Sequence, residues 1–176
     1  MEMLIIVDEN DREIGQMEKM EAHRKGVLHR AISVCLFDDE NRWLLQKRAQ
    51  GKYHCPGLYA NSCCSHPRSG ESAIDAASRR IKEELGVHTP LSFHSHFVYK
   101  KDVGGGLIEH EYDHLFVGQC TDTPQPNPEE VESVVWWTQE EIKEKLQTTP
   151  EIFAPWFPLI VDCILGGPDK VIRETK

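Results

Sequence analysis

Residues 71–87 read ESAIDAASRRIKEELGV and form the most regular segment of the chain. The aliphatic residues recur at intervals of three or four: Ile74, Ala77, Ile81 and Leu85. This spacing predicts an amphipathic helix over Glu71–Leu85 with that stripe buried. Gly86 follows at the position where a left-handed C-terminal cap is expected.

Arg80 and Glu84 lie four residues apart, so they share one face of this helix beside the buried stripe. A structural ion pair, worth about 0.3–0.5 kcal/mol, is one interpretation of the two residues. In the functional alternative, Glu84 holds a magnesium ion and Arg80 contacts phosphate oxygens.

The sequence around this helix alternates strands with helices, and several strands are expected to pair as hairpins. The expected strands are Leu4–Val7, a short one near Ile14, Arg30–Phe37, Trp43–Arg48, Phe93–Lys101, Leu107–Gln119 and Ser133–Trp137. Residues 51–68 are expected to form loop and short extended pieces, and residues 121–130 an exposed loop. Gly104–Gly106 fits a hairpin turn better than a phosphate cradle.

Two further helices are expected near the end of the chain. Thr138 and Glu141 form a capping box for a helix to about Leu146, and Ile152–Leu165 is predicted as the last helix, with Pro155 in its first turn. The whole pattern predicts an α/β fold of the α+β kind, a mixed sheet covered by helices, in a single domain over residues 1–176. A doubly wound parallel sheet is not expected.

Composition excludes several classes of function. The formal net charge is −9, which argues against a nucleic-acid partner, and a diphosphate ligand would need a locally basic or metal-bearing site. No stretch approaches the roughly 20 apolar residues of a membrane span, and the N-terminus lacks a secretory signal, so a cytoplasmic protein without membrane contact is expected. The six cysteines are then expected to be reduced.

Three clusters could carry chemistry, although each has a plain structural explanation. Cys64 and His66 lie in the segment Asn61–Pro67, where a metal site, a nucleophile or ordinary core residues are all compatible. Glu109 and Glu111 point to one side of a predicted strand, and a cation between them would remove their repulsion. His23 and His29 could bind a metal or lie on the surface.

A scatter of basic residues could provide the local positive charge that a diphosphate requires. These residues are Lys19, Arg48, Lys52 and Arg80.

The helix segment resembles the Nudix box, G-x₅-E-x₇-R-E-U-x-E-E-x-G-U, where U is an aliphatic residue. The matching positions are Glu71, Arg79, Ile81, Glu83, Glu84, Gly86 and Val87. Two positions depart, because Ser65 stands at the opening glycine and Arg80 replaces a glutamate that binds metal in Nudix enzymes. This loss argues against ordinary Nudix pyrophosphate hydrolysis.

A wider resemblance, from about Met17 to Trp156, is to type I isopentenyl-diphosphate Δ-isomerases. It is carried by Glu18-Lys19, Ala22-His23, Leu28-His29-Arg30-Ala31, Lys47-Arg48-Ala49, Pro56-Gly57, Asn61-Ser62-x-Cys64-x-His66-Pro67-x-x-x-Gly70-Glu71, Glu84-Leu85-Gly86-Val87 and Glu109-x-Glu111. The resemblance implies a Nudix-like fold. It also implies interconversion of isopentenyl and dimethylallyl diphosphate in isoprenoid biosynthesis.

The same resemblance implies roles for individual residues. It implies five ligands of one divalent metal, Mn²⁺, Mg²⁺ or Zn²⁺: His23, His29, His66, Glu109 and Glu111. It implies that Glu84 helps to hold a second ion, a Mg²⁺ that bridges the diphosphate. It implies four diphosphate contacts: Lys19, Arg48, Lys52 and Arg80. Cys64 and Glu111 would transfer protons, Tyr99 would lie beside Glu111, and Trp156 would face the hydrocarbon.

This chemistry suits those residue types. Protonating an unactivated alkene requires a strong or well-placed acid, and the tertiary carbocation needs a neighbour that does not attack it. An indole face provides a cation–π contact of about 2 kcal/mol when it is desolvated. A Nudix hydrolase of a nucleoside diphosphate derivative and a zinc-stabilised module without catalysis remain as alternatives, and the oligomeric state stays open.

Overall fold

The computed structural model describes residues 2–167 and 173–174, and residue 1 and the remaining C-terminal residues of the expected 1–176 domain lie outside the described part. The strands are β1 Met3–Val7, β2 Glu13–Glu18, β3 His29–Phe37, β4 Trp43–Arg48, β5 Tyr59–Ala60, β6 Cys63–Ser65, β7 Ser92–Gly104, β8 Leu107–Gln119, β9 Val131–Trp137 and β10 Arg173–Glu174. The helices are α1 Lys19–Lys25, α2 Ala73–Leu85, α3 Gln139–Thr148 and α4 Phe157–Gly166, with a 3₁₀ turn at Pro150–Ile152.

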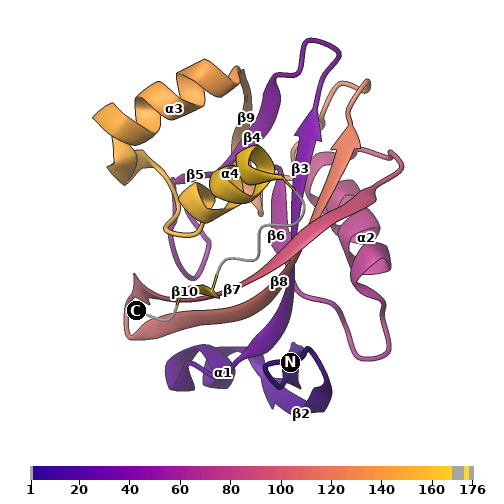
Figure 1. The fold of residues 1–176 in the computed structure, drawn as a ribbon, viewed down its shortest axis with the longest axis vertical. Coiled ribbons are helices and arrows are strands. Elements are labelled where there is room, and N and C mark those ends of the chain that lie inside the picture. The colour runs from indigo at the N-terminus through magenta and orange to yellow at the C-terminus, as the bar shows by residue number, and fades with distance from the viewer. Residues whose placement is uncertain (1, 168–172, 175–176) are drawn as a thin grey trace.

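The described strands form one mixed sheet that branches at β3 (Figure 1). Along one edge β3 runs parallel to β8, which forms a long antiparallel hairpin with β7. Along its other edge β3 pairs in turn with β1, β6 and β4. Because β3 and β8 are in register with His29 beside Glu111, and β7 places Tyr99 beside Glu111, three polar residues meet at one level of the sheet.

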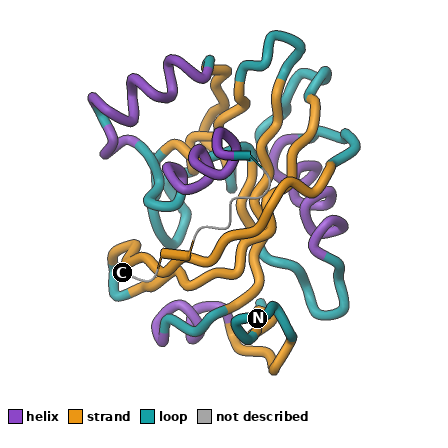
Figure 2. Tube along the Cα trace, in the orientation of Figure 1, coloured by secondary structure: helices purple, strands orange, loops and turns teal. Residues whose placement is uncertain are grey.

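Helices cover both faces of this sheet (Figures 1 and 2). Alternate residues of β3 point to opposite faces, so Ile32, Val34 and Leu36 pack with α2, whereas Cys35 packs with α3 and α4. Two separate apolar cores result, one on each face of the sheet. The candidate site lies beyond the end of the second core, where α1 and the segments around β5 and β6 meet β8.

Most of the predicted elements are confirmed, including the mixed sheet, the β7–β8 hairpin and the capping box of α3. Gly86 is the left-handed C-cap of α2, with φ of 65°. Gly104–Gly106 form the hairpin turn, all with positive φ. No helix among the described residues is long and apolar enough to cross a membrane.

Three expectations about elements are wrong or incomplete. Ile74 is 37% exposed, so it does not belong to the buried stripe of α2. The last helix begins at Phe157 instead of Ile152, and Pro155 precedes it. The chain before it forms a 3₁₀ turn at Pro150–Ile152 and then packs beside β5, where Ala154 donates its N–H to the Tyr59 carbonyl. Helix α1 was not expected from the sequence, and its N-cap is the side chain of Glu18.

Candidate metal centre and active site

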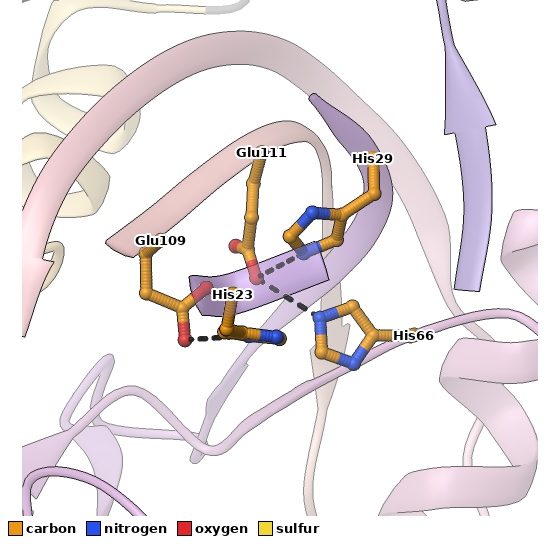
Figure 3. A group of neighbouring side chains, drawn as sticks. All are labelled: His23, His29, His66, Glu109 and Glu111. Atoms are coloured by element: carbon orange, nitrogen blue, oxygen red, sulfur yellow. Dashed lines mark hydrogen bonds and ion pairs between the residues drawn. The ribbon is translucent and has the colours of Figure 1, made fainter. Parts of the chain in front are cut away.

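Five buried side chains from four parts of the chain meet at one point (Figure 3). Strand β8 contributes Glu109 and Glu111, which lie on the same face because strand residues alternate. Helix α1 contributes His23, the first residue of β3 contributes His29, and the segment after β6 contributes His66. One ligand atom from each lies within 4.8 Å of all the others. This group is called the His/Glu cluster below.

Direct contacts hold the His/Glu cluster together. Nε2 of His66 lies 3.0 Å and Nε2 of His29 lies 3.6 Å from Oε1 of Glu111. Nε2 of His23 lies 3.4 Å from Oε1 of Glu109. His110, between the two glutamates, faces away and contacts the Gly26 carbonyl through Nδ1 at 2.9 Å.

Backbone carbonyls orient two of the imidazoles. Nδ1 of His23 lies 2.7 Å from the Lys19 carbonyl, and Nδ1 of His29 lies 2.8 Å from the Val27 carbonyl. A carbonyl can only accept, so Nδ1 carries the proton in each ring, and the neutral ring presents the Nε2 lone pair to the cluster. Metal-bound histidines commonly have this arrangement.

The electrostatics of the His/Glu cluster fit a divalent cation. Nε2 of His29 and Oε2 of Glu109 are buried and have no hydrogen-bond partner among the described residues. Burial alone would raise the pKa of Glu109, but the contacts with His23 and His54 hold that pKa well below its usual value. Burial lowers the pKa of His66 and therefore favours a neutral ring. Three imidazoles and two carboxylates suit Zn²⁺ or Mn²⁺.

A cavity opens beside the His/Glu cluster. Glu111 and Tyr99 line it, and the Tyr99 hydroxyl donates to Oε2 of Glu111 at 2.8 Å. Cys64, on β6, also lines it, and its thiol donates to Oδ1 of Asn61 at 3.0 Å. Burial raises the pKa of Cys64 far above its usual value, so the sulfur is a neutral thiol at neutral pH. The indole of Trp156, 3% exposed, forms another wall.

All four basic residues expected at the site line this cavity: Lys19, Arg48, Lys52 and Arg80. Three of them pair with carboxylates, because Lys19 contacts Glu2 at 2.9 Å and Glu130 contacts both Lys52 and Arg80. The structure therefore brings the local positive charge into a chain whose net charge is −9. A dianionic or trianionic ligand could exchange with Glu130 on two of these cations.

Glu84 does not belong to the His/Glu cluster. Its Oε1 accepts from Arg80 at 2.6 Å, and its Oε2 accepts from Gln46 at 3.0 Å. The expected pairing of Arg80 with Glu84 on one face of α2 is confirmed. Because Arg80 fills the place of a box glutamate, this end of the box places a cation between two carboxylates, Glu83 at 2.8 Å and Glu84 at 2.6 Å.

Comparisons with known proteins agree with this architecture. Residues 27–157 match the family model described as the NUDIX domain. A solved structure of DR0079 from Deinococcus radiodurans superposes with a TM-score of 0.75 and 20% identity, covering 92% of this chain and 99% of that one. A MutT protein from Methanosarcina mazei gives a TM-score of 0.64 at 14% identity, covering 77% and 91%. At these identities the structural neighbours establish the fold alone.

Curated relatives are much closer in sequence. An isopentenyl-diphosphate Delta-isomerase 2 from Aromatoleum aromaticum is 44% identical over 94% of this chain and 87% of its own length. An isopentenyl-diphosphate Delta-isomerase from Serratia proteamaculans is 47% identical over 91% and 89%. The chain belongs to the isopentenyl-diphosphate Δ-isomerase family. Its Nudix fold and the family resemblance expected from the sequence are both confirmed.

In this isomerase-family chain, three residues at or next to the cavity were missed from the sequence: His54 and Glu130 line it, and Ser33 lies next to Cys64. His54 contacts Glu109, Glu130 pairs with Lys52 and Arg80, and Ser33 lies 3.5 Å from the Cys64 sulfur. Ser33 also donates to Oδ2 of the buried Asp113 at 2.6 Å. A lone serine, glutamate or histidine without a motif gives no sequence signal, and only the fold brings these residues to the cavity.

Proposed function

We infer that this chain is an isopentenyl-diphosphate Δ-isomerase that interconverts isopentenyl and dimethylallyl diphosphate, a step of isoprenoid biosynthesis. The observation that carries the inference is a single cavity lined by three members of the His/Glu cluster, a thiol and four basic side chains. Relatives of 44–47% identity, named for this reaction and aligned over most of the chain, support it.

His23, His29, His66, Glu109 and Glu111 would hold one divalent ion. Such an ion neutralises two buried carboxylates, acidifies nearby protons and fixes the ligand geometry. Mn²⁺, Mg²⁺ and Zn²⁺ are the candidates. Glu84 is the proposed ligand of a Mg²⁺ that accompanies the diphosphate. It forms an ion pair with Arg80, which lines the cavity.

The diphosphate would bind among Lys19, Arg48, Lys52 and Arg80. The planar guanidinium of arginine can donate two hydrogen bonds to phosphate oxygens. Lys52 and Arg80 already share one acidic partner, Glu130. Binding there would direct the hydrocarbon of the substrate toward Cys64, Glu111 and Trp156, which line the same cavity.

Double-bond transposition adds one proton to the terminal methylene carbon and removes another from the carbon next to the oxygen-bearing one. Cys64 and Glu111 are the proposed proton-transfer residues, with Tyr99 holding Oε2 of Glu111. The substrate passes through a tertiary carbocation, and no atom other than hydrogen is exchanged. The two groups come from different strands, β6 and β8, so they can act on different carbons.

Trp156 would stabilise the carbocation with its π-face without forming a bond to it. The Arg48 guanidinium already lies 5.3 Å from the centre of this ring, which supports a role of the indole in binding a cation. The ring is buried, and a dry wall protects the carbocation from capture by water.

A Nudix hydrolase of a nucleoside diphosphate derivative is the second candidate. One observation favours this class, namely the Nudix fold. Arg80 counts against it, because it stands in the place of a box carboxylate. The family relationship also favours the isomerase, which leaves the diphosphate intact.

Incubation with isopentenyl diphosphate, Mg²⁺ and Mn²⁺ in deuterated water tests the function. We expect dimethylallyl diphosphate that contains deuterium, together with recovered substrate that has exchanged hydrogen. Release of inorganic phosphate should stay at background, and the same incubation with a nucleoside diphosphate sugar should release no monophosphate. Absence of both isomer and deuterium uptake would overturn the assignment.

A further inference from the structure

His54 is a buried histidine that lies next to the His/Glu cluster without belonging to it. Its side chain is 4% exposed, and its Nε2 touches Oε1 of Glu109. Nε2 has no hydrogen bond of regular geometry among the described residues. Glu109 is thus approached by two imidazoles, His23 at 3.4 Å and His54.

The neighbours of His54 determine which of its nitrogens carries the proton. Nη2 of the Arg48 guanidinium lies 3.5 Å from Nδ1 of His54, and a guanidinium can only donate hydrogen bonds. Nδ1 must therefore offer a lone pair, which leaves the proton of a neutral ring on Nε2, facing the carboxylate of Glu109. Arg48 also donates to the His54 carbonyl at 3.1 Å, so the whole residue is anchored.

The ring of His54 is also packed between aromatic side chains. It meets Trp156 edge to face, with 5.6 Å between the ring centres, and it meets Tyr53 edge to face at 4.2 Å. His54 therefore touches a residue of the metal site, a residue of the basic site and the proposed carbocation-facing indole.

We propose that His54 is a positioning residue, which donates its Nε2–H to Glu109 and so fixes the orientation of that carboxylate for metal binding. Carboxylate ligands are commonly held by such outer partners, whose removal weakens metal binding by about 10–100-fold. The five members of the His/Glu cluster already supply one ligand atom each within 4.8 Å, and His54 is not among them. His54 therefore acts on the metal through Glu109.

Three variants separate the hydrogen bond from the ring. His54→Gln keeps a donor at a similar distance from the backbone but loses the ring, whereas His54→Phe keeps the ring against Trp156 but loses the donor. His94→Phe is the matched control, because His94 is a half-buried histidine on β7 that contacts Ser95 and does not line the cavity. Thermal unfolding of each metal-free protein shows whether the variants fold.

Metal binding is the primary measurement, made without substrate by titration of the metal-free proteins with Mn²⁺. We expect the Kd to rise about 10–100-fold in His54→Phe, to stay within about threefold in His54→Gln, and to be unchanged in His94→Phe. The Co²⁺ absorption bands of saturated His54→Phe should match the unmodified protein, because the ligand set is the same. Relative to the unmodified protein, the kcat of His54→Phe at saturating Mn²⁺ should therefore fall less than its activity at limiting Mn²⁺.

Unchanged Mn²⁺ affinity in a folded His54→Phe protein would overturn the proposal. Equal weakening by Gln and Phe would also overturn it, since the donor would then be irrelevant. Altered Co²⁺ bands in His54→Phe would make His54 a direct ligand and contradict the positioning role. The kcat comparison rests on the proposed function, but the metal titrations do not, so a failure of the isomerase assignment is distinguishable from a failure of the proposal.

Discussion

Glu111 is engaged on both carboxylate oxygens by residues with different proposed roles. His29 and His66 lie within 3.6 Å of Oε1, and the Tyr99 hydroxyl donates to Oε2. One side chain thus joins the proposed metal site to the proposed proton-transfer site. A substitution there should affect both properties at once.

Glu111→Gln preserves the shape of the side chain but removes its negative charge. We expect loss of turnover by at least about 10³-fold together with weaker Mn²⁺ binding, because an amide is a poorer ligand and a much weaker base. Metal content after dialysis and turnover by the deuterium assay measure the two effects. Full metal retention in the variant would contradict the ligand role of Glu111.

Cys64→Ala should separate the two properties instead. The sulfur lies outside the His/Glu cluster, and its contacts are with Asn61 and Ser33. We expect isomerisation to fall to background while Mn²⁺ affinity stays within about twofold, since no ligand is touched. Cys163→Ala, at a buried cysteine outside the cavity, serves as the control. Near-normal turnover of Cys64→Ala would remove the thiol from the mechanism.

The sequence located the functional residues that lie in recognisable patterns. Glu109 and Glu111 follow from strand alternation, and Arg80 with Glu84 follow from helical spacing, so both pairs could be placed from periodicity. His54 could not, because it lies far from Glu109 in the sequence, in a loop between β4 and β5 that carries no motif. Roles that depend on such long-range contacts require the fold.

At the scale of elements, the turn between β1 and β2 is attached to the central strands through Asp11. Its Oδ1 accepts from Nε of Arg30 at 2.8 Å, and its Oδ2 lies 2.8 Å from Nε2 of His114. Burial alone would raise the pKa of Asp11, but the hydrogen bonds from His114 and Arg30 lower it. A charged Asp11 therefore stabilises the packing of this hairpin on β3 and β8.

Asp11→Asn should reduce stability in a pH-dependent way. A lowered folded-state pKa means that the contribution is present above the unfolded value of 3.8 and disappears as the pH falls through the folded value. We expect the unfolding free energy to drop by about 1 kcal/mol at pH 7 and the difference to vanish near pH 2. Asparagine tolerates the positive φ of 61° at this position, so backbone strain does not confuse the comparison.

Urea unfolding of both proteins between pH 2 and pH 7 measures this effect. Asp39→Asn, in an exposed turn, is the control and should leave stability unchanged. A destabilisation by Asp11→Asn that stays constant down to pH 2 would show that the charge of Asp11 is not responsible.

Element prediction succeeded where the pattern is local and failed where a distant segment decides. The α2 cap and the β7–β8 turn depend on glycines that can be read directly. The start of α4 depends on two contacts with Tyr59, which lies far away in the sequence. Ala154 donates its N–H to the Tyr59 carbonyl, and Phe153 forms a β-bridge with Tyr59. Ile74 lies in the first turn of α2 and is exposed, although helical spacing puts it on the same face as the buried Ala77 and Ile81.

At the scale of the whole molecule, the two apolar cores lie on opposite faces of the sheet and do not include the His/Glu cluster. Each core contains at least thirteen buried residues, enough apolar surface to support the fold without help from a metal. The proposed metal site lies instead where α1 and the segment after β6 meet β8. This separation distinguishes an enzyme with a catalytic metal from a module whose metal is its core.

Removal of the metal should therefore inactivate the protein and lower its Tm without unfolding it. Binding at 100 times the Kd contributes about 2.7 kcal/mol, and for a chain of this size that corresponds to a Tm change of roughly 5–10 °C. We expect the chelated protein to keep its far-ultraviolet circular dichroism and one cooperative transition, since both cores remain buried. Added Mn²⁺ should restore the Tm, and it should do so only weakly in Glu111→Gln. A metal-free protein without a cooperative transition would instead favour the zinc-stabilised module, because the metal would then be holding the fold together.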